Sequence, residues 1–512
     1  MKQGYRKQMV MLAAIAALAV TAGCGKSGET GSSSSSPVAS PSEASETKPA
    51  LKVLQLWQKD DYNSYPVAKV LEEETGYKVQ YDMLPQEKSQ DKLNLMIASG
   101  EAYDAITTVG VTDFKALYSD YARRGALVDL GPLIDQYGPN IKASISQASF
   151  DAVKVDGKIY AIPTKSIEFA GKSLMIRQDW LDKLNLNMPT TLDELVVVLR
   201  AFKEKDPGGN GDQNVPMTIH GAEPFIGNID GAFGLANAWN DVNGKLVPRV
   251  LDPNYKAYVS FVNGLFAEGL LDKEFAVNTD VTAKEKFSSG KAGVYPMYWA
   301  DVPTVTDALL KNQPEAKWAY VPPLKGKDGK QGLAATSGFD RLTYIPKSAK
   351  HPEDAIKWMN AKLDKDLFKL MTIGEEGKHH TFEDGAYTPI LPIFTDERNA
   401  ANNYLSGIDE ENYPVYRQAR VRKDMRLFAA WEDLNVKLPE SVRIPDPLGM
   451  SPYLAEFSKN NAALNTLVSD QTVKFIVGAD PLANIDAFVQ KYNTSGGDVS
   501  VKEVNDWYAT KE

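Results

Sequence analysis

The pattern of hydrophobic and polar residues after about residue 50 switches repeatedly between the short apolar runs of strands and the stripes of amphipathic helices. We expect strands at 51–57, 77–83 and 103–109, and helices at 65–75 and 86–99. A glycine follows each of the two helices, as is common at a helix end. Strand, helix and strand in this order predict an α/β sheet whose parallel neighbours are joined by right-handed crossovers.

The residues directly after the first predicted strand are the first candidates for a binding site. Ligands of parallel α/β sheets lie outside the carboxyl ends of the strands. Trp57, Gln58 and Asp61 come just after such an end, and we expect them to bind ligand. A structural role, in which Trp57 only covers the sheet edge, is the alternative interpretation.

An uncharged hydrophobic run from Met9 to Cys24 follows three basic residues near the start of the chain. A basic segment, about a dozen apolar residues and a small-residue site are typical of a secretory signal, and the run is too short for a membrane helix. The final Thr-Ala-Gly-Cys resembles the bacterial lipobox, although that motif usually has leucine where Thr21 stands. We expect residues 1–23 to be a lipoprotein signal peptide and Cys24 to be acylated. In the alternative, the protein is secreted and Cys24 has no role.

The segment that follows, residues 24–50, is rich in serine and proline. It lacks the apolar residues that a folded core needs. We therefore expect a disordered tether between the acylated cysteine and the folded part, with a span of roughly 25 to 30 Å.

The composition is that of a large exported globular protein. The chain has 512 residues, 43% hydrophobic and 24% charged, which is enough for two or more domains. It contains one cysteine, so no disulfide forms within the chain. The formal net charge of −10 argues against nucleic acid as a partner and against electrostatic binding to anionic lipid. No later apolar run approaches membrane length, so the predicted acyl chains are the expected membrane anchor.

Several short motifs occur in order along the chain. Asp156-Gly157 predicts a hairpin turn, and Thr191 with Glu194 three residues later predicts a capping box at a helix start. The segments that carry a wider similarity are 156–163, 176–184, 189–195, 206–211, 285–301, 338–346, 351–360, 374–380 and 474–481. In sequence and order they resemble the extracellular solute-binding lipoproteins of bacterial ABC importers, specifically the oligosaccharide-binding, LplA-like members of family 1.

This resemblance implies a two-lobed α/β fold of the periplasmic-binding-protein type, class II. Each lobe is expected to be a mainly parallel sheet flanked by helices, with extra helices at the C-terminus. The first lobe would contain 51–163 and 339–390, and the second lobe 164–338 and 391–512. We expect the lobes to close on a ligand by a hinge motion.

The same resemblance implies a set of ligand-binding residues. Trp299 is the strongest candidate, because it follows a Gly-Lys-Ala turn and a strand as in sugar-binding importers, and Tyr298 and Asp301 flank it. The C–H face of a sugar packs on an aromatic ring, while its hydroxyl groups need fixed polar partners. A core position at a strand end is the alternative for Trp299. Further candidates near the expected lobe edges are Trp239, Phe339 and Arg341.

The segment 206–217 has the spacing of a degraded EF-hand-like calcium loop. Its candidate ligands are Asp206, Asn210, Asp212 and Asn214. Calcium needs several oxygen ligands and a glycine for the sharp turn. Gly208 and Val215 stand where similar oligosaccharide-binding proteins have Asn and Glu, so ligands are lost. We therefore expect a Gly-rich turn, no cofactor and no favoured metal, with a structural calcium ion as the alternative.

Together these features predict a substrate-binding lipoprotein of an ABC transporter. It would capture a small-molecule solute, an oligosaccharide, between its lobes and deliver it to membrane permease subunits driven by a cytoplasmic ATPase. The expected location is the extracellular face of the cell membrane of a Gram-positive cell.

Enzymatic activity is not expected, because the chain has no nucleophile elbow, zinc-protease motif or phosphate loop. Carboxylates are abundant, with 67 Asp and Glu, so a secreted glycoside hydrolase or another carbohydrate-active lipoprotein is the alternative. A surface scaffold would predict internal repeats, and the sequence has none.

Overall fold

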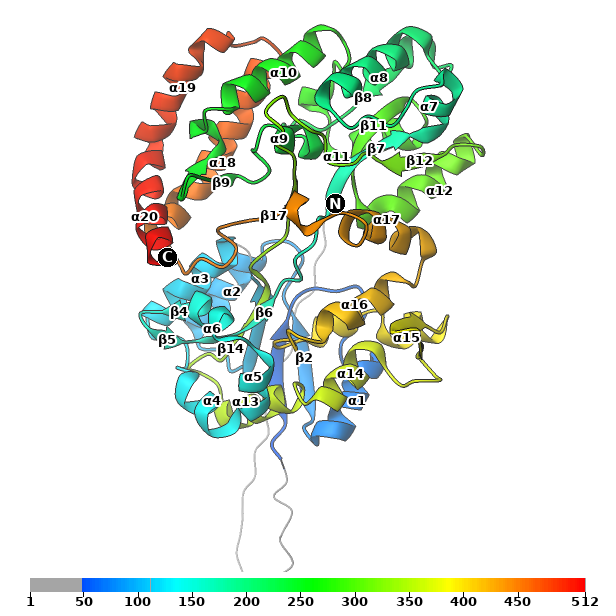
Figure 1. Cartoon of the computed structure of the whole chain (residues 1–512). Coiled ribbons are helices and arrows are strands. Elements are labelled where there is room, and N and C mark those ends of the chain that lie inside the picture. The colour runs from blue at the N-terminus through cyan, green and yellow to red at the C-terminus, as the bar shows by residue number, and fades with distance from the viewer. Residues whose placement is uncertain (1–47, 111, 512) are drawn as a thin grey trace, which may run out of the picture. The chain divides into compact units, whose positions relative to one another are not determined.

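The computed structural model of the protein describes residues 48–110 and 112–511. The predicted signal peptide, Cys24 and nearly all of the predicted tether lie outside these residues. Figure 1 shows that the described part has two lobes, each built around its own sheet. Among the described residues, no helix has both the length and the hydropathy needed to cross a membrane.

The first sheet has five strands and contains the three strands predicted from the N-terminal pattern. In spatial order they are β2 (Val79–Met83), β1 (Leu51–Gln55), β3 (Ala105–Val109), β14 (Phe339–Tyr344) and β6 (Ala161–Lys165). β1 pairs in parallel with β2 and β3, as expected, whereas β14 pairs antiparallel with both β3 and β6. A strand from far along the chain thus completes the sheet beside β3.

Helices cover both faces of this sheet, because its strands place apolar side chains alternately on the two faces. Val53 lies in the core under one face and Leu54 in the core under the other. The helices of this lobe are α1 (Pro66–Thr75), α2 (Ser89–Ser99), α3 (Thr112–Arg123), α4 (Gly131–Tyr137), α5 (Pro139–Ser144), α6 (Gln147–Val153), α13 (Pro352–Ala361), α14 (Lys365–Ile373), α15 (Ile393–Arg398) and α16 (Tyr413–Val421).

Two hairpins complete the first lobe. They are β4 (Lys154–Val155) with β5 (Lys158–Ile159), and β15 (His380–Glu383) with β16 (Ala386–Pro389). Asp156 and Gly157 form the turn of the first hairpin, with positive φ angles of 49° and 80°. The predicted Asp-Gly turn is therefore confirmed.

The segment 391–421 packs on the first lobe, whereas the predicted division assigned it to the second. Ala401, Tyr404 and Tyr413 are buried in the core beneath the first sheet. The Tyr404 hydroxyl donates a hydrogen bond of 2.7 Å to the carbonyl of Tyr62, a residue 342 positions away. Contacts across this distance leave no local pattern in the sequence, and therefore the boundary could not be predicted from it.

The second sheet has four strands in the order β12 (Trp318–Tyr320), β7 (Lys172–Arg177), β11 (Ala292–Tyr298) and β8 (Val215–Met217). β7 pairs antiparallel with β12 and β11, and β8 pairs parallel with β11. The expectation that this sheet is mainly parallel is therefore not met. An apolar run predicts a strand, but the direction of pairing depends on long-range contacts, and mixed sheets are common in α/β proteins.

The helices of the second lobe include the one predicted from the capping-box motif. They are α7 (Gln178–Leu184), α8 (Leu192–Lys205), α9 (Gly227–Ala232), α10 (Tyr255–Ala267), α11 (Asp280–Ser288), α12 (Val302–Asn312), α17 (Met425–Asn435), α18 (Ala455–Ile476), α19 (Ile485–Tyr492) and α20 (Asp498–Tyr508). At the start of α8, Glu194 N donates to Thr191 Oγ1 and Thr191 N donates to Glu194 Oε2, both at 3.2 Å. The capping box is thereby confirmed.

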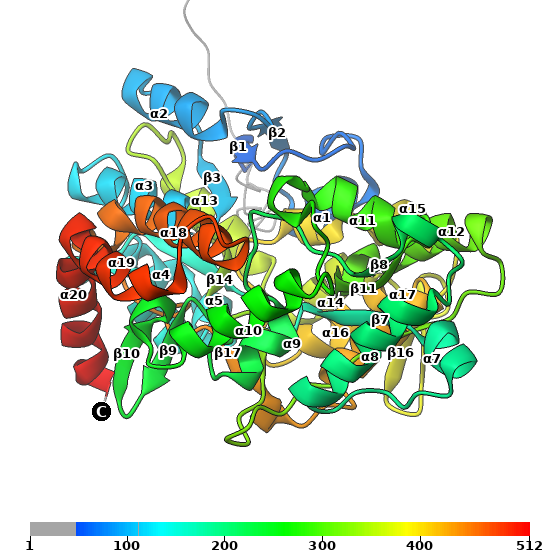
Figure 2. The ribbon, with the colours of Figure 1, turned by 90° about the horizontal axis from the view of Figure 1, so that it is seen from above.

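Two small sheets and the C-terminal helices complete this lobe. The sheets are β9 (Trp239–Val242) with β10 (Lys245–Pro248), and β13 (Leu333–Ala335) with β17 (Arg443–Pro445). Figure 2 shows α18, α19 and α20 gathered at one end of the molecule beside β9 and β10. Leu246 N in β10 donates to Asn505 Oδ1 in α20 at 2.9 Å, which attaches the last helix to the hairpin.

The chain crosses between the lobes in segments that hydrogen-bond to one another. Ser166 N donates to the carbonyl of Gly338 at 2.8 Å, and Thr336 N donates to the carbonyl of Phe169 at 2.9 Å. The first crossing leads from β6 to β7, and the second leads from β13 back to β14. A third crossing leads from α16 to α17. Paired crossings of this kind are the natural place for a hinge.

Candidate binding cleft

The carboxyl ends of β1 and β3 lie at the edge of the first sheet from which the chain crosses to the second lobe. β14 begins directly after a crossing and runs antiparallel to β3, so β3 must end where β14 begins. β1 is parallel to β3 and ends at the same edge. The predicted residues after β1 and those at the start of β14 therefore share one edge of the sheet, as the rule for α/β binding sites requires.

Gln58 and Arg341 are joined at this edge through Asn403. Asn403 Nδ2 donates to Gln58 Oε1 at 2.6 Å, and Arg341 Nη2 donates to Asn403 Oδ1 at 3.0 Å. Gln58 and Arg341 are both buried, and Gln58 Nε2 has no hydrogen-bond partner among the described residues. A buried amide without a partner is costly, so this group is available to donate to a ligand. Sequence reasoning missed Asn403, because no local signal relates it to residues more than 60 positions away.

Trp57 and Asp61 lie in the loop after β1 and differ in role. The Trp57 side chain is 48% exposed, which is unusual for so large an apolar group. Asp61 accepts hydrogen bonds from the backbone N–H and the side-chain amide of Asn63, at 3.2 and 3.1 Å, and these bonds lower its pKa. Asp61 therefore shapes the loop, while Trp57 presents an open aromatic surface.

The second lobe contributes the end of β11, where Tyr298, Trp299 and Asp301 lie. Trp299 was expected to offer its ring to a ligand, but it is only 5% exposed. It packs edge-to-face on Trp431, with ring centroids 5.3 Å apart, and its Nε1 has no hydrogen-bond partner in the described part of the chain. The alternative interpretation, a core tryptophan at a strand end, fits this burial better. Asp301 forms an ion pair of 2.8 Å with Lys284.

Tyr298 is the residue of this group that faces the first lobe. It is partly buried, and burial raises the pKa of its hydroxyl while the nearby Arg417 on α16 opposes that rise. An influence of Arg417 on Tyr298 requires the two side chains to be near each other across the lobes. Tyr298 therefore lies near charged groups of the first lobe, Arg417 on α16 and Asp340 on β14.

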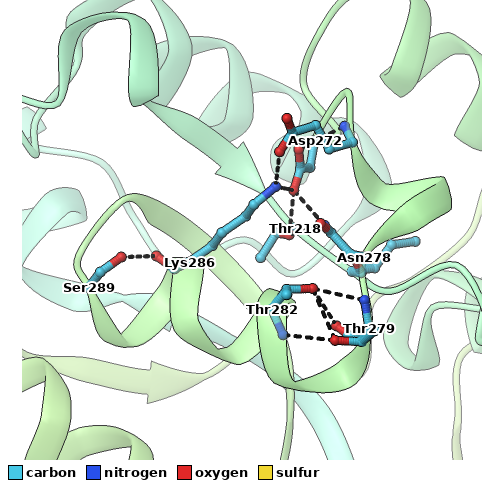
Figure 3. A network of polar contacts seen from close by, with 9 residues as sticks. Thr218, Asp272, Asn278, Thr279, Thr282, Lys286 and Ser289 are labelled. Carbon is cyan, nitrogen blue, oxygen red and sulfur yellow. Dashed lines mark hydrogen bonds and ion pairs between the residues drawn. The ribbon is translucent and has the colours of Figure 1, made fainter.

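A polar network fixes α11, the helix that leads into β11 (Figure 3). The buried carboxylate of Asp272 accepts three hydrogen bonds of 2.8 Å. The donors are Thr218 Oγ1, Asn278 Nδ2 and Lys286 Nζ. Burial alone raises the pKa of Asp272, but these hydrogen bonds, with Lys286 the strongest, hold it below its ordinary value. A charged, fully bonded carboxylate thus holds α11 against the second sheet.

Trp239 and Phe339, from different lobes, line one cavity of about 260 Å³. Both are buried, and Trp239 packs edge-to-face on Phe457 with ring centroids 5.7 Å apart. Lys115 Nζ lies 5.9 Å from the centroid of the Phe339 ring, and burial lowers the pKa of this ammonium to about 8. A neighbouring cavity of about 370 Å³ shares Trp239 and Phe457. The smaller cavity therefore lies between the lobes, whereas residues of the second lobe alone line the larger one.

The segment 206–217, where a Gly-rich turn was expected and a calcium ion was the alternative, is held by hydrogen bonds of its own side chains. Both oxygens of Asp206 accept backbone hydrogen bonds, from Asn210 N at 2.9 Å and Gly211 N at 2.7 Å. The amides of Asn210 and Asn214 donate to the carbonyls of Gly290 and Phe202. No group of three or more His, Cys, Asp or Glu side chains that could hold a metal occurs in the described residues. The loop is therefore a hydrogen-bonded turn that ties the end of α8 to the second lobe.

The sequence and the fold are those of a known family. A family profile described as "Bacterial extracellular solute-binding protein" matches residues 67–374. The match covers more than half of the chain, and the protein therefore belongs to the bacterial extracellular solute-binding proteins. The resemblance seen in the sequence motifs is thereby confirmed.

Individual relatives agree with this assignment. The chain is similar to the polygalacturonan/rhamnogalacturonan-binding protein YtcQ of Bacillus subtilis, with 27% identity over 89% of this chain and 91% of YtcQ. It is similar to the fructooligosaccharide ABC transporter substrate-binding protein FusA of Streptococcus pneumoniae, with 31% identity over 63% of this chain and 62% of FusA. The solved structure of S. pneumoniae FusA in complex with kestose superposes with a TM-score of 0.69, at 22% identity, over 90% of this chain and 99% of that chain. The two-lobed α/β fold is thereby confirmed.

Proposed function

We propose that the protein is the substrate-binding component of an ABC transporter and that it binds an oligosaccharide between its lobes. The observation that carries this proposal is the exposed ring of Trp57 beside the unpartnered amide of Gln58. Sugar recognition needs this combination, because the apolar face of the ring packs on an aromatic surface and the hydroxyl groups bond to fixed polar partners. Similarity to FusA and YtcQ, both named for carbohydrate ligands, supports a sugar over other solutes.

The lobes close on the ligand about the crossings at 166–171 and 336–338. Tyr298 moves with the second lobe, whereas Gln58 and Arg341 move with the first. A ligand that contacts Tyr298 and the first-lobe residues together binds the closed state more tightly than the open state. This difference in affinity drives closure.

The protein acts at the cell surface, held by a lipid anchor on Cys24. Residues 1–23 direct export, and 24–50 serve as a tether that lets the folded part move beside its transporter. Its partners are the permease subunits that receive the oligosaccharide, in a cell with a single membrane. The support for this part is the lipobox-like sequence and the tether composition.

A thermal-shift screen combined with product analysis tests the proposal. The purified protein is heated with a panel of neutral and acidic oligosaccharides, and each mixture is then analysed for shortened chains. We expect at least one oligosaccharide to raise the melting temperature, since a ligand at about 100 times its Kd stabilises by about 2.7 kcal/mol. The same oligosaccharide should be recovered intact. Release of shorter sugars would instead support the glycoside hydrolase, and the lack of any shift would refute sugar binding.

A further inference from the structure

Four cations on and just after elements of the first lobe lie near one another and form one group, the cation row. They are Arg341 on β14, Arg417 and Arg420 on α16, and Lys423 just after α16. Short hydrogen bonds to one segment, Arg398–Asn403, hold three of them. Arg341 Nη1 donates to the carbonyl of Asn402 at 2.5 Å, and Arg420 Nη2 donates to Asn402 Oδ1 at 3.0 Å.

The rest of the row is held in the same way. Arg420 Nη1 donates to the carbonyl of Arg398 at 2.6 Å and Nη2 donates to the carbonyl of Asn399. Lys423 Nζ donates to Asn399 Oδ1 at 2.6 Å. These acceptors are carbonyl and amide oxygens, which satisfy the hydrogen bonds of the cations without cancelling their charge.

Few carboxylates compensate the positive charge of the row, with Asp424 acting on Lys423 and Asp340 on Arg341. Within the described residues, the one carboxylate within ion-pair distance of the four cations is Asp340, 3.1 Å from Arg341 Nε and 58% exposed. By contrast, other charges near the cleft are paired, with Lys172 on Glu223 at 2.5 Å and Lys284 on Asp301 at 2.8 Å. In a chain with a net charge of −10, an unpaired group of cations at this place needs an explanation.

The cations are close enough to repel one another. Burial lowers the pKa of Arg420, and the charges of Arg417 and Arg341 lower it further. Burial also lowers the pKa of Lys423, with additional repulsion from Arg420 and Arg417. A bound anion would relieve both the repulsion and the loss of hydration.

Arg417 is the member of the row that a structural role does not explain. Arg341 and Arg420 fix the segment Arg398–Asn403, but Arg417 makes no hydrogen bond or ion pair to any described residue. Its Nε is buried without an acceptor, and its charge acts on Tyr298 of the opposite lobe. A guanidinium presents a planar fork that matches a carboxylate.

We infer that the oligosaccharide of this protein is acidic, with uronic-acid residues, and that Arg417 binds one of its carboxylates in a bidentate manner. The inference rests on the proposed sugar-binding function and specifies its ligand class. A neutral sugar would leave the fork of Arg417 and the charge of the row unused. The cations also attract an anionic ligand at a distance, so binding should weaken as salt rises.

The test compares acidic trisaccharides with their uncharged methyl esters. Calorimetry measures how tightly the protein binds trigalacturonate, trimannuronate and the fully methyl-esterified form of each. Kestose is included as an unrelated neutral trisaccharide. We expect at least one acidic trisaccharide to bind ten times more tightly than its ester, with an affinity that falls between 50 and 500 mM salt. Arg417→Gln should weaken binding of the acid by about 10- to 150-fold and leave the ester unchanged. Arg417→Lys, which keeps the charge but loses the fork, should fall between the two.

Arg200→Gln is the matched control. Arg200 is paired with Glu268 on the outer surface of the second lobe, at 2.8 Å, and its loss should change neither ligand. Equal binding of acid and ester, or binding of kestose without binding of either acid, would overturn the inference while leaving the proposed sugar function intact. Undiminished binding of the acid by Arg417→Gln would also overturn it. If no oligosaccharide of any kind binds, the proposed function itself fails.

Discussion

Replacing Trp57 by alanine should weaken ligand binding without affecting folding. Trp57 is 48% exposed, whereas the other predicted tryptophans, Trp239 and Trp299, are 4% and 5% exposed. Its ring therefore contributes little to the core, and its open surface remains available for a sugar. The prediction depends on this difference between one exposed and two buried indoles.

The size of the effect follows from the exposed area. A tryptophan side chain offers up to about 250 Å² of surface, so an exposure of 48% leaves about 120 Å² for a ligand to cover. At about 25 cal/mol per Å², covering half to all of this area contributes about 1.5 to 3 kcal/mol. Trp57→Ala should thus raise the Kd about 10- to 150-fold. The free energy of unfolding should change by no more than about 0.5 kcal/mol.

Calorimetric titration with the best oligosaccharide of the screen measures the Kd, and urea unfolding without ligand measures stability. Phe382→Ala is the control, because Phe382 is similarly exposed, at 45%, but lies on the β15–β16 hairpin and not in the loop after β1. Unchanged affinity in Trp57→Ala would refute the reasoning. An equal loss of affinity in Phe382→Ala would refute it as well, because the effect would then not be specific to the cleft.

Three further predictions concern stability. Trp299→Ala should lower the unfolding free energy by about 3 to 5 kcal/mol, because a buried tryptophan is lost. A loss below about 1 kcal/mol in urea unfolding would contradict the core position of Trp299. Asp272→Asn should lower the unfolding free energy at neutral pH. Because the pKa of Asp272 is lowered in the folded state, this difference from the wild type should shrink as the pH falls below about 4. A difference that stays constant down to pH 3 would be evidence against the network. Burial lowers the pKa of Lys115 to about 8, whereas the unfolded chain still holds the proton up to about pH 10. Between pH 7 and pH 10, the unfolding free energy of the wild type should therefore rise by about 2.5 kcal/mol relative to that of Lys115→Met. Equal stability differences at the two pH values would show that this ammonium is not desolvated.

Features that depend on neighbouring residues could be predicted from the sequence. The strands and helices between Leu51 and Val109 follow from hydrophobic period alone, and the structure places them within a few residues of the predicted ends. The Asp156-Gly157 turn and the capping box of Thr191 are likewise local, since the backbone conformation and the bonding partners lie within three residues. The position of Gln58 at the carboxyl edge of β1 followed from the general rule for parallel sheets.

Features that depend on distant segments could not be predicted. The role of Asn403 arises only when residues from three parts of the chain meet. Arg417 lies on α16, in a segment that the prediction assigned to the other lobe. The burial of Trp299 depends on Trp431, a residue of α17 whose contact with β11 no local pattern indicates. A motif thus identified the strand that ends at Tyr298, but it did not reveal which aromatic ring faces the cleft.

A crystal structure of the protein with a bound oligosaccharide tests the central claim most directly. We predict a sugar ring stacked on Trp57, a hydrogen bond donated by Gln58 Nε2, and a ligand that also contacts Tyr298 from the second lobe. A sugar bound on an outer surface, or in the cleft without contact to the first-lobe edge at Gln58, would contradict it.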